Sequence, residues 1–305
     1  MNDPIASVTV TFNAEVLIAE HLRLLQGQTH GLSEIIVVDN ASSDGTLAVL
    51  AGEFPQVTVL SLPVNVGVGG GYAAGLAYAL GKNHHSIWTL DQDSRPAADC
   101  LGELVGAALQ CRGKAEPVAL LAPRSRNLAT GLDYAGFGWR DGMVNLPDDE
   151  HAAVQWVDVV ISSGSLFSAP AVIAAGLPRE DFFMDFVDFE YCLRLRQMGY
   201  RIGVVRKAVM GHAVGMPEKR RFLGIPRVWA THVPWREYYK IRNQTFTIWH
   251  GQPTVRGKLY LMRKFLRHAL AVVIYDPQKL RRLRFMFAGL RDGIRGKLGV
   301  VVKPF

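Results

Sequence analysis

Residues 86–93 read Ser86-Ile87-Trp88-Thr89-Leu90-Asp91-Gln92-Asp93, an apolar run that ends in two carboxylates one residue apart. The apolar run predicts a buried strand, and side chains two residues apart in an extended segment point the same way. Asp91 and Asp93 can therefore converge on one hard cation or on one set of hydroxyl groups. A magnesium or manganese ion that bridges a diphosphate suits this geometry, because such ions prefer oxygen ligands and substrate phosphates. Two acids after a strand are, however, more often part of a solvated turn.

Short β-rich runs alternate with helical stretches on both sides of this segment. The pattern predicts strands over residues 5–11, 34–38, 57–60, 86–90 and 118–122, and helices over residues 15–25, 46–53, 70–80 and 98–111. Such alternation is typical of a mostly parallel sheet covered by helices, an α/β fold. Ligands of open α/β sheets bind beyond the carboxyl ends of the strands. Asn13, Asp39 and Asp91 fall there.

The second half of the chain is less regular. Over residues 124–150 the periodicity fades into Gly, Asn and Asp, which predicts irregular loops or a small hairpin. Strands over residues 154–160 and 201–205 and a helix over residues 189–198 follow, and the pattern after Trp235 is helical. We therefore predict one α/β domain over residues 1–234, which we divide into two halves, residues 1–100 and 101–234. A helical region over residues 235–305 follows.

Composition limits the class of protein. The chain has 305 residues and is 49% hydrophobic, which is ample for a sizeable core and argues against disorder. Its three cysteines show no metal-ligand spacing and predict reduced, buried thiols in the cytoplasm. We find no signal segment, and no apolar stretch approaches the roughly 20 residues that span a bilayer. The sequence thus predicts a protein that is neither secreted nor integral to a membrane.

The net charge of +7 is concentrated at the C-terminal end. Residues 251–305 carry thirteen Lys and Arg against two Asp, and apolar residues are interleaved with these cations. Basic amphipathic helices of this kind can lie in an anionic membrane interface. We therefore expect peripheral association with the inner face of the cell membrane, with a nucleic-acid surface or an oligomer interface as alternatives. A nucleic-acid patch is disfavoured because it would be more polar.

Two further segments could contact a nucleotide. Asp39 ends the strand over residues 34–38, where a carboxylate can accept a hydrogen bond from the imide N–H of a base. The glycine-rich run over residues 65–71 permits close backbone approach and would direct helix N–H groups at an anion. It is a poor dinucleotide fingerprint, because it follows the third strand instead of the first. Since Asn13-Ala14-Glu15 occupies the position after the first strand, a dehydrogenase is disfavoured.

Taken together, these segments resemble the family 2 glycosyltransferases, the inverting class with the GT-A nucleotide-sugar-binding fold. The matching stretches are residues 8–13, 37–46, 65–71 and 91–93. The resemblance implies a nucleotide-sugar donor and a divalent metal cofactor, Mg²⁺ or Mn²⁺. It also implies that residues 1–100 are the nucleotide-binding half of the domain and that residues 101–234 are the acceptor and catalytic half. It implies donor binding by Thr11, Phe12, Asn13, Asp39, Asn65, Gly67, Gly70, Gly71, Asp91, Gln92 and Asp93.

An acid-rich segment over residues 181–194 strengthens the resemblance. It resembles the family segment that supplies the catalytic base, and its form Asp185-Phe186-Val187-Asp188 is similar to bacterial rhamnosyltransferases. The resemblance implies that Asp188 is the general base, supported by Asp185, Glu190 and Arg194. The helix dipole also favours acids at a helix start. That explanation suffices for Asp181 but not for Asp188.

The resemblance extends to metal and acceptor contacts. It implies that His212 completes the metal site with Asp91 and Asp93, and imidazole suits manganese better than magnesium. It implies acceptor contacts from Ser163, Gly164, Trp235, Tyr239 and Arg242. For the last three, an amphipathic core helix is an equally good explanation.

The function implied is inverting transfer of a sugar to a hydroxyl of a glycan or lipid-linked acceptor, in bacterial cell-surface polysaccharide synthesis. L-Rhamnose from dTDP-rhamnose is the first choice, and a UDP-sugar such as UDP-galactofuranose is the alternative. Asp39 does not decide between them, because thymine and uracil present the same imide. A catalytically silent, membrane-associated scaffold is disfavoured by the presence of Asp93, Asp188 and His212. We expect no nucleic-acid partner, and homo-oligomerisation is left open.

Overall fold

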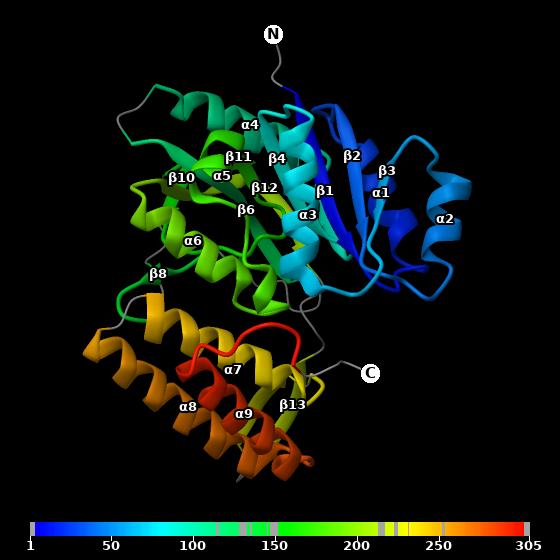
Figure 1. The fold of residues 1–305 in the computed structure, drawn as a ribbon. Coiled ribbons are helices and arrows are strands. Elements are labelled where there is room, and N and C mark those ends of the chain that lie inside the picture. The colour runs from blue at the N-terminus through cyan, green and yellow to red at the C-terminus, as the bar shows by residue number, and fades with distance from the viewer. Residues whose placement is uncertain are drawn as a thin grey trace. The chain divides into compact units, whose positions relative to one another are not determined.

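The computed structural model describes residues 4–113, 116–127, 133–134, 136–144, 146, 152–212, 217–222, 225–230, 232–251 and 254–301 (Figure 1). The chain forms two compact units, each made of three segments. The first unit comprises Met1–Gly138, Asn145–Glu180 and Asp188–Ala213, and the second comprises Trp139–Val144, Asp181–Val187 and Val214–Phe305. The domain boundary expected after residue 234 stays a prediction.

A ten-stranded mixed sheet forms the first unit, in the order β10-β12-β6-β11-β4-β1-β2-β3, with β5 paired to β12 and β7 to β6. The strands are β1 (Ile5–Thr11), β2 (Glu34–Asp39), β3 (Thr58–Ser61), β4 (Ser86–Asp91), β5 (Ser94–Pro96), β6 (Val118–Asn127), β7 (Asp133–Tyr134), β10 (Val154–Val157), β11 (Leu166–Ser168) and β12 (Arg201–His212). The pairs β1–β2, β1–β4, β2–β3 and β6–β12 are parallel, whereas β11 and β10 run antiparallel to their neighbours. The α/β class predicted from the alternation is confirmed.

Helices cover this sheet: α1 (Ile18–Gln26), α2 (Thr46–Glu53), α3 (Gly67–Gly81), α4 (Cys100–Cys111), α5 (Ala169–Ala175) and α6 (Val187–Gln197). α3 lies across β1 and β2 (Figure 1). A Cβ atom on Gly71 would lie 2.6 Å from Val10 Cγ1, and Gly75 makes a similar approach to Val8. These glycines therefore allow close packing of α3 on β1.

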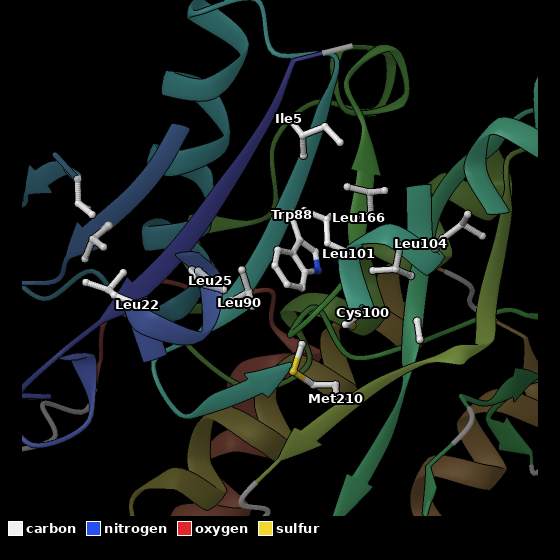
Figure 2. Close-up of a cluster of buried hydrophobic side chains, with 14 of the residues drawn as sticks. Ile5, Leu22, Leu25, Trp88, Leu90, Cys100, Leu101, Leu104, Leu166 and Met210 are labelled. Carbon is white, nitrogen blue, oxygen red and sulfur yellow. The ribbon is translucent and has the colours of Figure 1, made fainter. Parts of the chain in front are cut away.

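The main core lies on the side of the sheet covered by α1 and α4. Figure 2 shows Trp88 of β4 among Leu22, Leu101, Leu166 and Met210, all of which are buried. The Trp88 indole N–H donates to the Gly164 carbonyl at 2.8 Å, which satisfies its one polar group. The three cysteines are buried free thiols, as expected. The segment at residues 86–90 thus forms a central buried strand.

The second unit contains α7 (Arg236–Phe246), a π-helical turn (Thr247–Gly251), α8 (Val255–Tyr275), α9 (Lys279–Ile294) and the hairpin β13 (Pro217–Phe222) and β14 (Ile225–Ala230). Two short strands, β8 (Gly138–Trp139) and β9 (Met143–Val144), pair with one another. The three long helices share a small core of Ile241, Phe265, Val272 and Met286. The predicted C-terminal helices are therefore present. Within the described ranges, no helix has the length and apolar content needed to cross a bilayer.

Several predicted bounds were wrong. The first helix begins at Ile18 instead of residue 15, and the helix after the glycine run begins at Gly67 instead of residue 70. The strand expected over residues 201–205 continues to His212, through an irregularity between Val205 and Val209. The strands β5 and β13–β14 were not predicted.

Candidate active site

The turn between β4 and β5 carries the paired carboxylates. Gln92 Oε1 accepts hydrogen bonds from Phe12 N at 2.7 Å and from Thr11 Oγ1 at 3.1 Å, which ties the turn to the carboxyl end of β1. Asp91 N donates to Ser94 Oγ at 3.0 Å. Gln92 therefore positions the turn, and the predicted donor residues of β1 and of the turn lie together at the carboxyl edge of the sheet.

His212 is brought to the same turn by its strand. In the antiparallel pairing of β12 with β5, the backbone of His212 is opposite Ser94, one residue from Asp93. The side chain of His212 lies outside the described residues. Among the side chains that are described, no group of three or more His, Cys, Asp or Glu is arranged to hold a metal. The donor set of two carboxylates and one imidazole nevertheless fits Mn²⁺ by its chemistry.

Tyr72, which was not predicted as a site residue, interacts with both Asp91 and Asp188. It is buried on α3 and its hydroxyl donates to Asp91 Oδ1 at 2.8 Å. Burial raises the pKa of the Tyr72 phenol well above its usual range, and the charges of Asp91 and Asp188 raise it further. Asp188 therefore lies within electrostatic range of the phenol that holds Asp91. The one sequence signal for Tyr72 is its place directly after the glycine run.

Asp39 ends β2 and is 1% exposed. Its Oδ2 accepts a hydrogen bond from Ser42 N at 3.2 Å, whereas Oδ1 is buried without a hydrogen-bond partner among the described residues. Nearly all buried polar atoms in proteins are paired, so an orphaned carboxylate oxygen requires an explanation. A donor group on a bound ligand would satisfy it.

The loops beside Asp39 are fixed by asparagine side chains. Asn40 was not predicted, and its side chain accepts from Val66 N at 2.8 Å and donates to the Gly67 carbonyl at 3.0 Å. Asn65 Oδ1 accepts from Gly67 N, where the positive φ of 77° favours glycine. Asn13 is exposed, and its Oδ1 accepts from Ser43 N at 2.8 Å.

The buried glycines of the predicted donor loop have packing roles. A Cβ atom on Gly70 would lie 2.5 Å from Val66 Cγ2, and Gly71 abuts Val10 as described above. A donor-binding role for these two glycines stays a prediction, and helix packing alone accounts for their identity.

Helix α6 carries the predicted base Asp188 in its first turn, where Asp188 Oδ1 accepts a hydrogen bond from Phe189 N at 2.9 Å. Glu190 and Arg194 form an ion pair of 3.0 Å one turn apart. The Arg194 guanidinium also donates to the carbonyls of Ala175 and Leu177. Glu190 and Arg194 therefore anchor α6 to the end of α5.

Ser163 and Gly164, predicted as acceptor contacts, adjoin the paired carboxylates. Ser163 is buried, and its Oγ lies 2.5 Å from Ser94 Oγ and 3.4 Å from Asp91 N. Gly164 has a φ of 83°, which favours glycine at this position. The structure thus brings this loop to the turn that carries Asp91 and Asp93.

The segment that leads into α6 belongs to the second unit and is held by α7. Arg242 and Asn243 are fully buried and donate to carbonyls of residues 181–185. Arg236 forms a bidentate ion pair with Asp185, at 2.8 and 2.9 Å. We name this set of contacts from Arg236, Arg242 and Asn243 the α7 clamp.

Three residues predicted to contact the acceptor lie on or next to α7. Tyr239 is fully buried and its ring lies 4.9 Å from that of Phe183, while Trp235 packs edge-on against Tyr239. Arg242 is equally buried and belongs to the α7 clamp. These surroundings favour the core-helix alternative for Tyr239 and Arg242, whereas Trp235 is only partly buried.

Residues 7–113 match the model of glycosyl transferase family 2. The chain is 26% identical over 305 residues to the dTDP-rhamnosyl transferase RfbF of Shigella flexneri, covering 98% of each chain. It is 28% identical over 225 residues to the galactofuranosyltransferase GlfT1 of Mycolicibacterium smegmatis, covering 72% of this chain and 74% of that protein.

Among solved structures, the crystal structure of GalNAc-T7 with UDP, GalNAc and Mn²⁺ superposes with a TM-score of 0.63 at 14% identity. The match covers 96% of this chain and 56% of the GalNAc-T7 chain. This likeness shows the GT-A fold that the sequence analysis predicted.

Proposed function

We propose that this chain, whose residues 7–113 belong to glycosyl transferase family 2, transfers L-rhamnose from dTDP-rhamnose to a hydroxyl of a glycan or lipid-linked acceptor, with inversion at the anomeric carbon. The observation that carries the proposal is the orphaned Oδ1 of Asp39, at the carboxyl end of β2. The likeness over the full chain to a dTDP-rhamnosyl transferase favours rhamnose. The likeness to a galactofuranosyltransferase favours UDP-galactofuranose as the second candidate.

Asp39 would recognise the nucleotide base. The imide N–H of thymine or uracil would donate to Oδ1 and satisfy the orphaned oxygen. A hydrogen bond to a charged group is worth about 1.5–3 kcal/mol and one to a neutral group about 0.5–1.5 kcal/mol, so Asp39→Asn, which keeps a neutral acceptor oxygen, should weaken dTDP or UDP binding about 5- to 10-fold. Isothermal titration calorimetry measures this, with Asp99→Asn at the exposed start of α4 as the matched control.

Asp91, Asp93 and His212 would hold a Mg²⁺ or Mn²⁺ ion, which neutralises the negative charge that develops on the leaving diphosphate. The turn is suited to this because Gln92 and Tyr72 fix its geometry on both sides of Asp91. Binding of Mn²⁺ in the presence of dTDP, followed by electron paramagnetic resonance, should be weakened by Asp93→Asn. This measurement does not depend on turnover.

Asp188 would act as the general base. It would take the proton of the acceptor hydroxyl while that oxygen attacks the anomeric carbon opposite the diphosphate, so that the C–O bond forms as the bond to dTDP breaks. General-base assistance contributes about 10²- to 10⁴-fold. Asp188→Asn should lose that factor in turnover while the affinity for dTDP stays at the wild-type value.

One experiment tests the whole proposal. The purified protein is incubated with dTDP-rhamnose or UDP-galactofuranose, with and without Mn²⁺, and slow donor hydrolysis and thermal shift are recorded. We expect the largest shift and hydrolysis with dTDP-rhamnose and Mn²⁺. A response to UDP-galactofuranose alone would establish the second candidate, and no response to either donor would refute both.

A further inference from the structure

The exposed side of α8 carries a continuous row of apolar side chains. Six residues recur at intervals of three or four and therefore lie on one face of the helix. We name them the α8 stripe, and their exposed fractions range from 44% to 74%: Val255, Leu259, Met262, Leu266, Leu270 and Val273. Large exposed apolar surfaces of this kind mark sites of interaction with a protein or a membrane.

The α8 stripe is not needed to hold the second unit together. The opposite side of α8 supplies the core residues Leu261, Phe265 and Val272, which are at most 3% exposed. α8 is thus apolar on both sides, and only one side is used for packing within the described part of the chain. The outer side requires a partner of its own.

Positive charge accompanies the α8 stripe. Arg256, Arg263 and Arg267 are exposed and are spaced by seven and four residues, which places them in one row along a flank of the stripe. The sequence of α8 contains no Asp or Glu. The neighbouring helix α9 adds exposed cations at Arg281 and Arg284 and an exposed ring at Phe287.

We propose that the α8 stripe and its arginine row dock the protein on the surface of an anionic lipid bilayer, with α8 lying in the plane of the interface. Acyl chains would receive the apolar side chains and anionic headgroups the arginines, as in other interfacial helices. A second copy of this chain is a poorer partner, because it would bring a like-charged arginine row against the first. Charge complementarity therefore selects the membrane.

Flotation with lipid vesicles tests the proposal. The 305-residue protein should bind vesicles of phosphatidylglycerol and phosphatidylcholine, and should bind pure phosphatidylcholine vesicles weakly. Replacing the three arginines together (Arg256→Gln, Arg263→Gln and Arg267→Gln) should lower binding about 100-fold, at about fivefold per charge. The variant Leu259→Ser/Leu266→Ser/Leu270→Ser should lose binding even to anionic vesicles, because these exposed side chains supply the apolar contact.

A matched control removes the same charge elsewhere. Arg23→Gln, Lys82→Gln and Arg112→Gln replace exposed cations of the first unit, and this triple variant should keep at least a third of the wild-type binding. Equal loss in the control would show a non-specific effect of net charge and would overturn the proposal. Absence of vesicle binding by the wild type would also overturn the proposal. A dimer of the wild type in solution that the Leu259→Ser/Leu266→Ser/Leu270→Ser variant no longer forms would do the same.

This inference goes beyond the proposed transfer reaction and is tested without a sugar donor. Turnover of the α8 variants on a soluble acceptor should equal that of the wild type, since none of the substituted residues lies in the site around Asp39, Asp91 and Asp188. If the wild type binds donor but not vesicles, the membrane proposal alone fails. If it binds vesicles but not donor, the proposed transfer reaction alone fails.

Discussion

Replacing Asn243 with alanine should slow sugar transfer without weakening donor binding. Asn243 is fully buried on α7, and its Nδ2 donates to the carbonyls of Phe182, Met184 and Asp185 at 2.9, 2.7 and 2.8 Å. These carbonyls belong to the segment that passes directly into α6, the helix that carries Asp188. We expect Asn243 to be a positioning residue for the base, because it fixes the backbone that precedes it.

The magnitude follows from the backbone of that segment. Phe183, Asp185 and Phe186 have φ angles of 64°, 54° and 68°, and left-handed geometry costs about 1–2 kcal/mol for each non-glycine residue, or about 3–6 kcal/mol together. Arg242 Nη2 and Asn243 Nδ2 together direct four N–H groups at these carbonyls, and at about 1 kcal/mol each they offset a cost of that size. Alanine removes the two N–H donors of Asn243, a loss of about 2–3 kcal/mol.

Losing this much hydrogen-bond stabilisation lets the segment before α6 relax. In most molecules the Asp188 carboxylate then no longer has its wild-type orientation. If relaxation is confined to this segment, kcat should fall about 30- to 150-fold, while the Kd for dTDP changes less than twofold. The assay compares steady-state kinetics with calorimetric donor binding and thermal unfolding. Gln244→Ala is the matched control, because Gln244 is also buried on α7 and its Nε2 has no hydrogen-bond partner among the described residues. Wild-type kcat in Asn243→Ala, or an equal loss of donor affinity, would refute the reasoning.

Three further perturbations test the surroundings of the paired carboxylates. Tyr72→Phe removes the hydrogen bond to Asp91 and should lower the free energy of unfolding in urea by about 1–2 kcal/mol. It should also weaken Mn²⁺ binding in the presence of dTDP. Unchanged values for both would show that this hydrogen bond does not support Asp91. His21 contacts Thr9 and the Ser94 carbonyl, and burial lowers its pKa, so that it takes up a proton on unfolding. The free energy of unfolding should therefore be highest above pH 6.5 and should fall as the pH drops below that value. The fall should be smaller in His21→Gln. Gly71→Ala places a methyl group against Val10 and should cost about 1–3 kcal/mol in urea unfolding, whereas Gly81→Ala, with open space around it, should be neutral or stabilising.

Local pattern was sufficient for the central strands and for the position of the carboxylates. The apolar run at residues 86–90 forms β4, and its acids lie at the carboxyl edge as expected. It was not sufficient for residues 206–212, whose basic start resembles a turn. That segment is strand because it pairs with β6 and β5, contacts that are remote in sequence.

The surroundings of the site depend on tertiary contacts that periodicity does not report. Tyr72 carries no motif of its own, and its importance comes from Asp91, 19 residues away. Arg242 lies in a segment whose family resemblance predicts a place near the acceptor. Its guanidinium instead donates hydrogen bonds to carbonyls that are 57 to 61 residues away in sequence. Close packing against Val10 accounts for the glycine at position 71 as well as contact with a donor phosphate would.

The interleaving of the two units along the chain bears on protein engineering. A single cut after residue 213 does not separate them, because residues 139–144 and 181–187 belong to the second unit. A truncated fragment would keep Asp188 but lose the α7 clamp that secures the residues before it. Chimaeras that exchange C-terminal regions between related enzymes should therefore carry both short internal segments with the helices, as one cassette.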